Sequence, residues 1–332
     1  MINNNFKKFI TKILPCLISF GILLYFCIQN NNFLVLINIF PKLKFVYLIL
    51  AIFSIFLSWF FDCLMIKNLL PKFSKSISDY FKITMYGQFY GAITPFSSGS
   101  QASQVILLNS KKVETGKAIS ILSQKFFISQ LCTIVISSLS IIFKSQEFKD
   151  KIPGFRFLTL AGLIIQCSGI ILLILFFINK RRVMNFIHYI LKIAKKIHII
   201  KNPEKISENL ENEMIFLMKN NFSVNFSPVI YFYGIMQNIL FCFVSFFIAK
   251  SFGCPGFPIL NFIAAQTFVT LLSIANPLPG SAGTAEGSFL LLYKNFFTVK
   301  NISPAMILFR FINYYFGMIA GFFIIIKRKN TK

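Results

Sequence analysis

Charged residues are scarce in this sequence, and their scarcity limits what the protein can be. Only 13% of the 332 residues are charged, whereas 56% are hydrophobic, a balance that no water-soluble domain of this length needs to bury its core. The sequence therefore predicts an integral membrane protein. The formal net charge of +24 does not indicate a nucleic-acid partner, because the basic residues lie in clusters beside apolar runs.

Signatures of metal, thiol and nucleotide chemistry are missing as well. The two histidines, His188 and His198, lie in a basic polar stretch, and the seven cysteines occur mostly in apolar runs without a CxxC pair. This pattern is typical of small buried thiols and gives a metal site or a Cys/His or Ser/His enzyme little support. No GxxxxGK[ST] motif is present. We expect no metal, no cofactor and no ATP-driven step.

Long apolar runs are what the sequence has in abundance. Six of them have the length of a full membrane span, and they cover residues 13–28, 45–66, 118–143, 157–178, 228–249 and 302–326. The first run is predicted to be a retained span and not a cleaved signal peptide, because no A-x-A-like site follows it. Lysines before the first run and after the last place both termini in the cytoplasm by the positive-inside rule.

The chain is expected to form one domain with two halves. The first half covers 1–178, with residues 33–40 lying along the outer interface, and the second half covers 227–326. Residues 179–226 form a polar, mixed-charge connector that is interpreted as an amphipathic cytoplasmic helix. This connector either is solvated or attracts anionic lipid.

Two stretches interrupt the apolar pattern. They read "YGAITPFSSGSQASQVILL" at 90–108 and "ANPLPGSAGTAEGSFLLLY" at 275–293. Residues 80–93, about 14 in number, are too few to cross a hydrocarbon core of roughly 30 Å. Because lysines follow the first stretch, residues 80–112 are predicted to enter from the cytoplasm and return, whereas the second break opens from the outer face.

The two stretches share a plan of proline, small residues and a short apolar helix. Gln104 lies nine positions after Pro95, and Glu286 lies nine positions after Pro277. The fold predicted is an all-α membrane protein with six full transmembrane helices and two re-entrant hairpins in an inverted repeat, about eight membrane segments. The alternative is a pair of kinked core helices.

Broken backbone at membrane depth must line a protein-enclosed cavity, because unsatisfied N–H and C=O groups cannot face lipid. Half-helices beginning near Ser97–Ser98 and near Ser281 to Thr284 would point their N-termini at the midplane and attract an anion such as a phosphate. Four hydroxyl residues either cap these helices or contact the ligand, and three glycines allow close backbone approach. These residues are Ser97, Ser98, Ser281, Thr284, Gly99, Gly280 and Gly283.

Charged residues inside the membrane are expensive unless they are paired or hydrated. Glu286 and Arg310 both lie in apolar runs, so they are candidate partners, either as a plain ion pair that fixes packing or as a cavity pair that meets a headgroup. Asp62 and Lys125 are weaker candidates. Asp62 lies near the inner end of its span, and Lys125 lies about two turns into its own and can snorkel.

"ITPFSSGSQASQ", "NPLPGSAGTAEGSFLLLY" and "FRFINYYFGMIAG", in that order, resemble the flippase-like membrane domain of lysylphosphatidylglycerol synthase, the multiple peptide resistance factor. The resemblance covers almost the whole chain. Three substitutions, Ser100, Ala102 and Leu278, depart from its motifs and concern headgroup specificity more than the fold. The positions that match the motifs are Thr94, Pro95, Phe96, Gly99, Gln101, Gln104, Pro277, Pro279, Gly280, Gly283, Glu286, Arg310, Tyr314 and Tyr315.

The resemblance implies a lipid translocase of the bacterial inner membrane that acts on an anionic, aminoacylated or polyprenyl-phosphate lipid. In the family a cytoplasmic domain transfers lysine from lysyl-tRNA to phosphatidylglycerol. This sequence ends six residues after its last predicted span, so we expect no aminoacyltransferase activity from it alone. Two alternatives remain: the membrane part of a synthase with a separate catalytic partner, and an ion-coupled transporter of a small anion.

Overall fold

The computed structural model describes residues 21, 25, 32–149, 153–178, 227–254 and 256–329. Every regular element in these ranges is a helix, so the all-α prediction is confirmed for the described part of the chain. The α-helices are α2 (Asn32–Ile39), α3 (Phe45–Leu69), α4 (Ile77–Ala92), α5 (Gly99–Asn109), α6 (Thr115–Phe148), α7 (Phe155–Ile178), α10 (Pro228–Ser251), α11 (Ile259–Ser273), α12 (Thr284–Leu292), α13 (Val299–Arg310) and α14 (Phe316–Lys329). Short helical turns are η2 (Phe40–Lys42), η3 (Pro95–Ser97) and η4 (Pro279–Ser281), and a π-helical segment, η5 (Phe311–Tyr315), joins α13 to α14.

Four helical segments in the described ranges are long and apolar enough to cross a membrane. They are α3, α6, α10 and the continuous run Val299–Lys327. These four coincide with predicted spans, and α7 covers the span expected at 157–178. The expected first span has only Gly21 and Tyr25 among the described residues, and the connector at 179–226 lies outside them.

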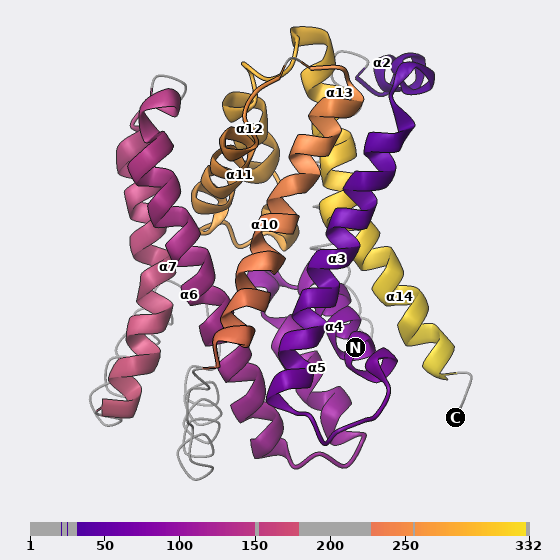
Figure 1. Ribbon diagram of the computed structural model, residues 1–332, viewed down its shortest axis with the longest axis vertical. Coiled ribbons are helices and arrows are strands. Elements are labelled where there is room, and N and C mark those ends of the chain that lie inside the picture. Colours follow the sequence, from indigo (N-terminus) through magenta and orange to yellow (C-terminus); the bar gives the residue numbers. More distant parts are fainter. Residues whose placement is uncertain are drawn as a thin grey trace, which may run out of the picture.

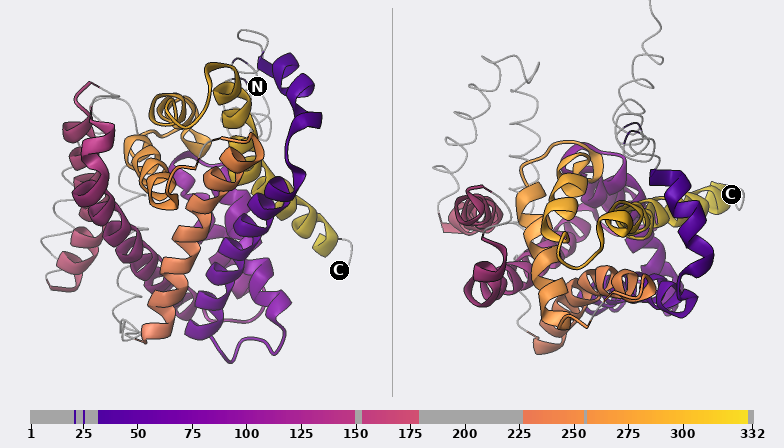
Figure 2. Two further views of the ribbon diagram at one scale, coloured as in Figure 1. Left: turned by 45° about the horizontal axis from the view of Figure 1, so that its top comes forward. Right: turned by 90° about the horizontal axis from the view of Figure 1, so that it is seen from above.

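The helices form a bundle whose two ends contain different short helices (Figure 1). α4 and α5 pack on each other in the lower half of this view, and α11 and α12 pack on each other in the upper half. α6 and α7 stand together at one side, and α14 runs down the opposite side against α4. Seen from above, α2 lies across the end of the bundle instead of along it (Figure 2), as expected for an interfacial segment.

α3 and α10 form the most extensive helix–helix contact among the described elements. Ser54 Oγ donates to Leu240 O at 2.8 Å, and Ser58 Oγ donates to Gln237 O at 2.8 Å. Small hydroxyl residues let two helix backbones approach and hydrogen-bond without a bulky side chain between them. This contact joins the two halves of the sequence.

Aromatic side chains fill the core beneath α11, α12 and α13. Phe289 and Tyr293 stack with ring centroids 4.2 Å apart, and both are fully buried. The Tyr293 hydroxyl donates to Ser245 Oγ at 2.9 Å, which satisfies the polar end of a buried ring. The pair of short helices α11 and α12 is therefore held by a rigid aromatic cluster.

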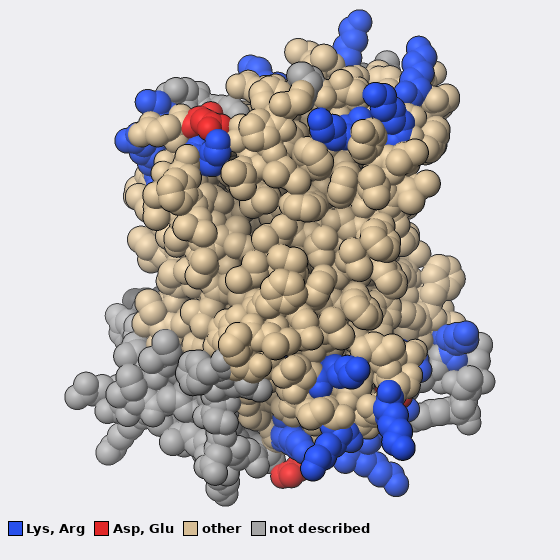
Figure 3. All heavy atoms as spheres, viewed as in Figure 1, with Lys and Arg blue, Asp and Glu red and all other residues tan. Residues whose placement is uncertain are grey.

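The outer surface is apolar over the middle of the bundle. Residues such as Phe53, Phe143 and Ile164 are exposed on three different helices. The visible face carries an uncharged belt between two ends rich in lysine and arginine (Figure 3), which is the surface expected of a protein that contacts lipid. The described part of the chain is that of a multi-pass membrane protein.

Candidate functional site where two helix breaks meet

The first break separates α4 from α5. After η3 begins at Pro95, Phe96 and Ser97 adopt left-handed conformations with φ of 52° and 54°, which is uncommon for residues other than glycine. The Thr94 hydroxyl donates to Tyr90 O at 2.7 Å and accepts from Gly99 N at 2.8 Å. Thr94 thus ties the end of one helix to the start of the next and helps to hold a strained turn in place.

The second break has the same backbone turn. η4 begins at Pro279, and Gly280 and Ser281 are left-handed with φ of 61° and 51°. The two turns therefore match Pro95 with Pro279. The sequence spacing had aligned Pro95 with Pro277, and that register is wrong by two residues because the left-handed pair follows the second proline of "PLPG" and not the first.

The two breaks touch each other. Phe96 N lies 3.4 Å from Pro277 O and donates to it, although the residues are far apart in the sequence. The Tyr314 hydroxyl, from η5, donates to Ala92 O at the end of α4 at 2.6 Å. Figure 1 shows the short helices of the two halves converging on the middle of the bundle from its two ends.

Glu286 and Arg310 form a buried ion pair at this junction. Arg310 Nε lies 2.7 Å from Glu286 Oε1, with side chains 6% and 0% exposed, and the contact lacks hydrogen-bond geometry. Arg310 Nη1 donates to Gly280 O at 3.0 Å, and the guanidinium lies 4.8 Å from the centre of the Tyr314 ring. Arg310 Nη2 has no acceptor among the described residues. The pairing expected from the sequence is present.

The helix N-termini are capped differently from the expectation. Glu286 Oε2 accepts from Gly283 N at 2.7 Å and caps α12, and Thr94 serves Gly99 at the start of α5. None of the four candidate hydroxyl residues accepts a capping bond: Ser98 Oγ donates to Pro95 O, and Thr284 Oγ1 donates to Ser281 O. Ser97 and Ser98 are exposed, Ser281 is half-buried and Thr284 is exposed. The backbone N–H groups of Gly99 and Gly283, at the helix N-termini expected to attract an anion, therefore already donate to protein oxygens.

Gln104 lies inside the first short helix pair. Its side chain is buried, Nε2 donates to Ile83 O at 3.1 Å, and Oε1 has no partner among the described residues. A Cβ placed on Gly87 would lie 2.4 Å from Gln104 Nε2, so this glycine allows α4 and α5 to approach. Gln101, one turn earlier, is half-buried.

A second polar cluster joins four helices away from the breaks. Lys125 of α6 lies 2.9 Å from Asp62 Oδ1 and 3.0 Å from Oδ2. Thr84 of α4 donates to Asp62 Oδ2 at 2.8 Å, and Gln237 of α10 donates to Oδ1 at 3.4 Å. Asp62 and Lys125 are thus partners, where the sequence presented two separate candidates near the interface.

The sequence matches a family described as the lysylphosphatidylglycerol synthase TM region over residues 12–321. The chain belongs to this family. It is also 26% identical over 305 residues to a UPF0104 membrane protein of Archaeoglobus fulgidus, an alignment that covers 84% of this chain and 86% of the relative. The resemblance inferred from the three motifs is confirmed.

This member of the lysylphosphatidylglycerol synthase TM family has further polar residues at the junction that the sequence did not single out. Asn276 Nδ2 donates to Ala282 O at 2.8 Å and to Thr284 Oγ1 at 2.9 Å, and an asparagine before "PLPG" is a recognisable turn signal. Asn313 lies in the π-helical segment, and both atoms of its amide are buried without a partner in the described ranges. π-Helical turns within α-helices frequently occur at functional sites.

Proposed function

We propose that this protein is a lipid translocase of the bacterial cell membrane, with both termini in the cytoplasm. The polar headgroup is held where the two breaks meet, and the acyl chains stay in the surrounding lipid. Anionic, aminoacylated and polyprenyl-phosphate lipids fit this proposal. The observation that carries it is the junction of the breaks, in which strained turns from both halves touch beside a buried ion pair with an unused hydrogen-bond donor.

The short helices support a re-entrant arrangement. α4 and α5 have 16 and 11 residues, and α11 and α12 have 15 and 9. At 1.5 Å per residue these helices reach about 24, 16, 22 and 14 Å, each less than a hydrocarbon core of roughly 30 Å. Because the two pairs occupy opposite halves of the bundle (Figure 1), we infer two hairpins that open to opposite sides of the membrane.

The junction offers the groups that a phosphate-bearing headgroup needs. Arg310 Nη2 and the Asn313 amide nitrogen are donors without partners in the described ranges. Charge-assisted hydrogen bonds from arginine to phosphate are strong in a site that excludes water. Glu286, already paired with Arg310, supplies the negative charge that an amino group on an aminoacylated lipid would meet.

Membership of the family favours a second candidate function. The family is described as the membrane region of lysylphosphatidylglycerol synthase, so this chain is alternatively the membrane part of such a synthase, supplied with product by a separate catalytic protein. A soluble aminoacyltransferase that co-purifies with the chain and restores lysyl transfer would support this alternative. Lipid translocation by the purified chain alone would support the first.

Reconstitution into lipid vesicles tests the translocase proposal. Fluorescent phosphatidylglycerol in the inner leaflet is protected from dithionite, so its loss of fluorescence measures movement to the outer leaflet. We expect translocation in vesicles with the protein, and none in vesicles with the heat-denatured protein. Uptake of free phosphate without lipid movement would instead indicate a small-anion transporter and would overturn the proposal.

Cysteine labelling tests the inferred topology. In a chain without its seven native cysteines, single cysteines at Lys111 and Lys196 are expected to react only from the cytoplasm. Cysteines at Lys149 and Thr298 are expected to react only from outside. Labelling of position 111 from outside would mean that 80–108 crosses the membrane, and the two-hairpin arrangement would be wrong.

A further inference from the structure

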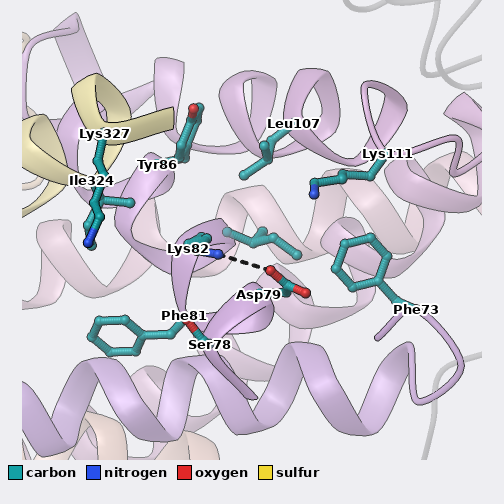
Figure 4. Close-up of a pocket in the computed structure, with 11 residues that line it drawn as sticks. Phe73, Ser78, Asp79, Phe81, Lys82, Tyr86, Leu107, Lys111, Ile324 and Lys327 are labelled. Atoms are coloured by element: carbon teal, nitrogen blue, oxygen red, sulfur yellow. Dashed lines mark hydrogen bonds and ion pairs between the residues drawn. The ribbon is translucent and has the colours of Figure 1, made fainter. Parts of the chain in front are cut away.

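A cavity of about 480 Å³ lies between α4, α5 and α14. It lies apart from the junction of the breaks, since none of the residues assigned to that site lines it. Lysine side chains and apolar side chains both border it (Figure 4). The lining residues are Phe73, Ser78, Asp79, Phe81, Lys82, Ile83, Tyr86, Leu107, Lys111, Ile324 and Lys327.

Positive charge dominates the polar side of the cavity. Three lysines line it against one carboxylate, Asp79. Lys82 comes from α4, Lys111 from the turn after α5, and Lys327 from the end of α14, so three separate elements bring their lysines to one opening. Figure 4 shows Lys82, Lys111 and Asp79 around the same space, with Lys327 on the α14 side.

Asp79 orients one of these lysines. Its carboxylate accepts from Ser74 Oγ at 2.8 Å and from Lys82 Nζ at 3.1 Å. The hydrogen bond from Ser74, followed by that from Lys82, lowers the pKa of Asp79 below its ordinary value, so the carboxylate stays ionised at neutral pH. Lys82 is therefore held at the rim of the cavity, while Lys111, in the turn after α5, is exposed beside it.

The apolar part of the cavity lining comes from three helices. Phe81 lies on α4, Leu107 on α5 and Ile324 on α14. A cavity with a cationic rim and an apolar wall fits an amphiphilic anion better than a soluble one. Its volume lies in the range of sites that hold small organic ligands.

We propose that this cavity binds the phosphate of an anionic phospholipid, with Lys82 and Lys111 on the phosphate and the apolar wall against the glycerol and the first part of the acyl chains. Phosphate is the chemistry that the lysines recognise, and it occurs both in lipids and in soluble phosphate esters. The site is separate from the junction of the breaks, so it stands whether or not the protein translocates lipid.

Binding to the purified full chain in detergent tests this site. The probes are dioctanoyl phosphatidylglycerol, dioctanoylglycerol, which lacks the phosphate, and glycerol 3-phosphate, which lacks the chains. We expect the phospholipid to bind at least tenfold more tightly than either fragment, as measured by isothermal titration calorimetry, and more weakly at high salt.

Variants locate the site. Lys82→Gln with Lys111→Gln is expected to weaken phospholipid binding at least tenfold, whereas Lys117→Gln, an exposed lysine outside the cavity, leaves it unchanged. Asp79→Asn removes the opposing charge and is expected to tighten binding several-fold. Ser78→Trp places a large side chain in the cavity from an exposed position and is expected to abolish binding while the elution profile of the folded protein is unchanged.

Three results would overturn the proposal. Equal binding of dioctanoylglycerol would show that the phosphate is not recognised, and equal binding of glycerol 3-phosphate would show that the ligand is a soluble phosphate ester. Wild-type phospholipid affinity in both the double lysine variant and Ser78→Trp would show that the lipid binds elsewhere.

Discussion

Two buried ion pairs lie in the described part of this bundle, and their surroundings differ. Lys125 contacts both oxygens of Asp62, and Thr84 and Gln237 donate to the same carboxylate. Four helices, α3, α4, α6 and α10, are joined there. Because protein donors already occupy both oxygens of the Asp62 carboxylate, this pair has the features of a structural contact that holds the helices together.

The Glu286–Arg310 pair is arranged in another way. One carboxylate oxygen caps its own helix and the other meets Arg310, whose Nη2 is left without an acceptor in the described ranges. It lies where strained turns of both halves touch. A buried charged group with an unused donor is costly unless something else satisfies it, which is why we assign the ligand to this pair and not to the other.

The largest expected effect concerns the Asp62 pair. Asp62→Asn leaves the Lys125 charge buried without its partner, and breaking a buried pair in this way costs about 3–5 kcal/mol. We expect a much lower yield of monodisperse protein and a lower thermal denaturation midpoint in detergent, and recovery of most of both in Asp62→Asn with Lys125→Gln. If the single variant were as stable as the wild type, the pair would not hold the helices together.

Alanine substitutions at three glycines of the second break and α12 distinguish backbone strain from steric contact. Gly280 has φ +61° and a Cβ there would lie 2.4 Å from Tyr314 Cε2, whereas Gly283 has φ +89° with nothing within 4 Å. Gly287 is helical and also has nothing within 4 Å. Replacement by alanine is expected to cost about 1–3 kcal/mol at 280 and about 1 kcal/mol at 283, and to stabilise the protein by about 0.4–1 kcal/mol at 287.

Thermal denaturation of the three alanine variants measures this order. Gly280→Ala is also expected to reduce translocation, because Tyr314 must move and Arg310 then loses its contact with Gly280 O. Equal midpoints for the variants at 280 and 287 would contradict the close packing at this turn.

The smallest effect is expected at the link between the halves. Tyr314→Phe removes the hydroxyl that donates to Ala92 O, and a single hydrogen bond contributes about 1 kcal/mol. Stability should fall slightly, while translocation falls more because the two breaks are held less firmly. A variant at Tyr90, a tyrosine of the first break that is also half-buried, serves as the control: Tyr90→Phe should keep wild-type translocation.

The spans within the described residues and the two breaks could be predicted from the sequence because they depend on length, hydropathy and proline. The Glu286–Arg310 pairing was also accessible, since few ionisable residues occur in the last two apolar runs. The contacts of Thr84 and Gln237 with Asp62 could not be predicted from the sequence. Neutral polar residues in apolar helices bond to their own backbone or across helices, and no local pattern distinguishes the two.

The alignment of the two breaks was inaccurate for a related reason. Spacing from proline to the next polar side chain matched Pro95 with Pro277, but the structural match depends on which residues take left-handed φ. In "PLPG" two prolines precede the turn, and their order alone does not say which one starts it. The capping roles of Thr94 and Glu286 followed from that backbone and were equally hidden.

Lipid translocation by two double variants in vesicles tests the central claim most directly. Glu286→Gln with Arg310→Gln and Asp62→Asn with Lys125→Gln each remove a whole buried pair, so both are expected to fold and insert. The account predicts that the Asp62 and Lys125 double variant moves lipid at close to the wild-type rate, whereas the Glu286 and Arg310 double variant moves none. Wild-type translocation by the Glu286 and Arg310 double variant would contradict the assignment of the headgroup to the junction of the breaks.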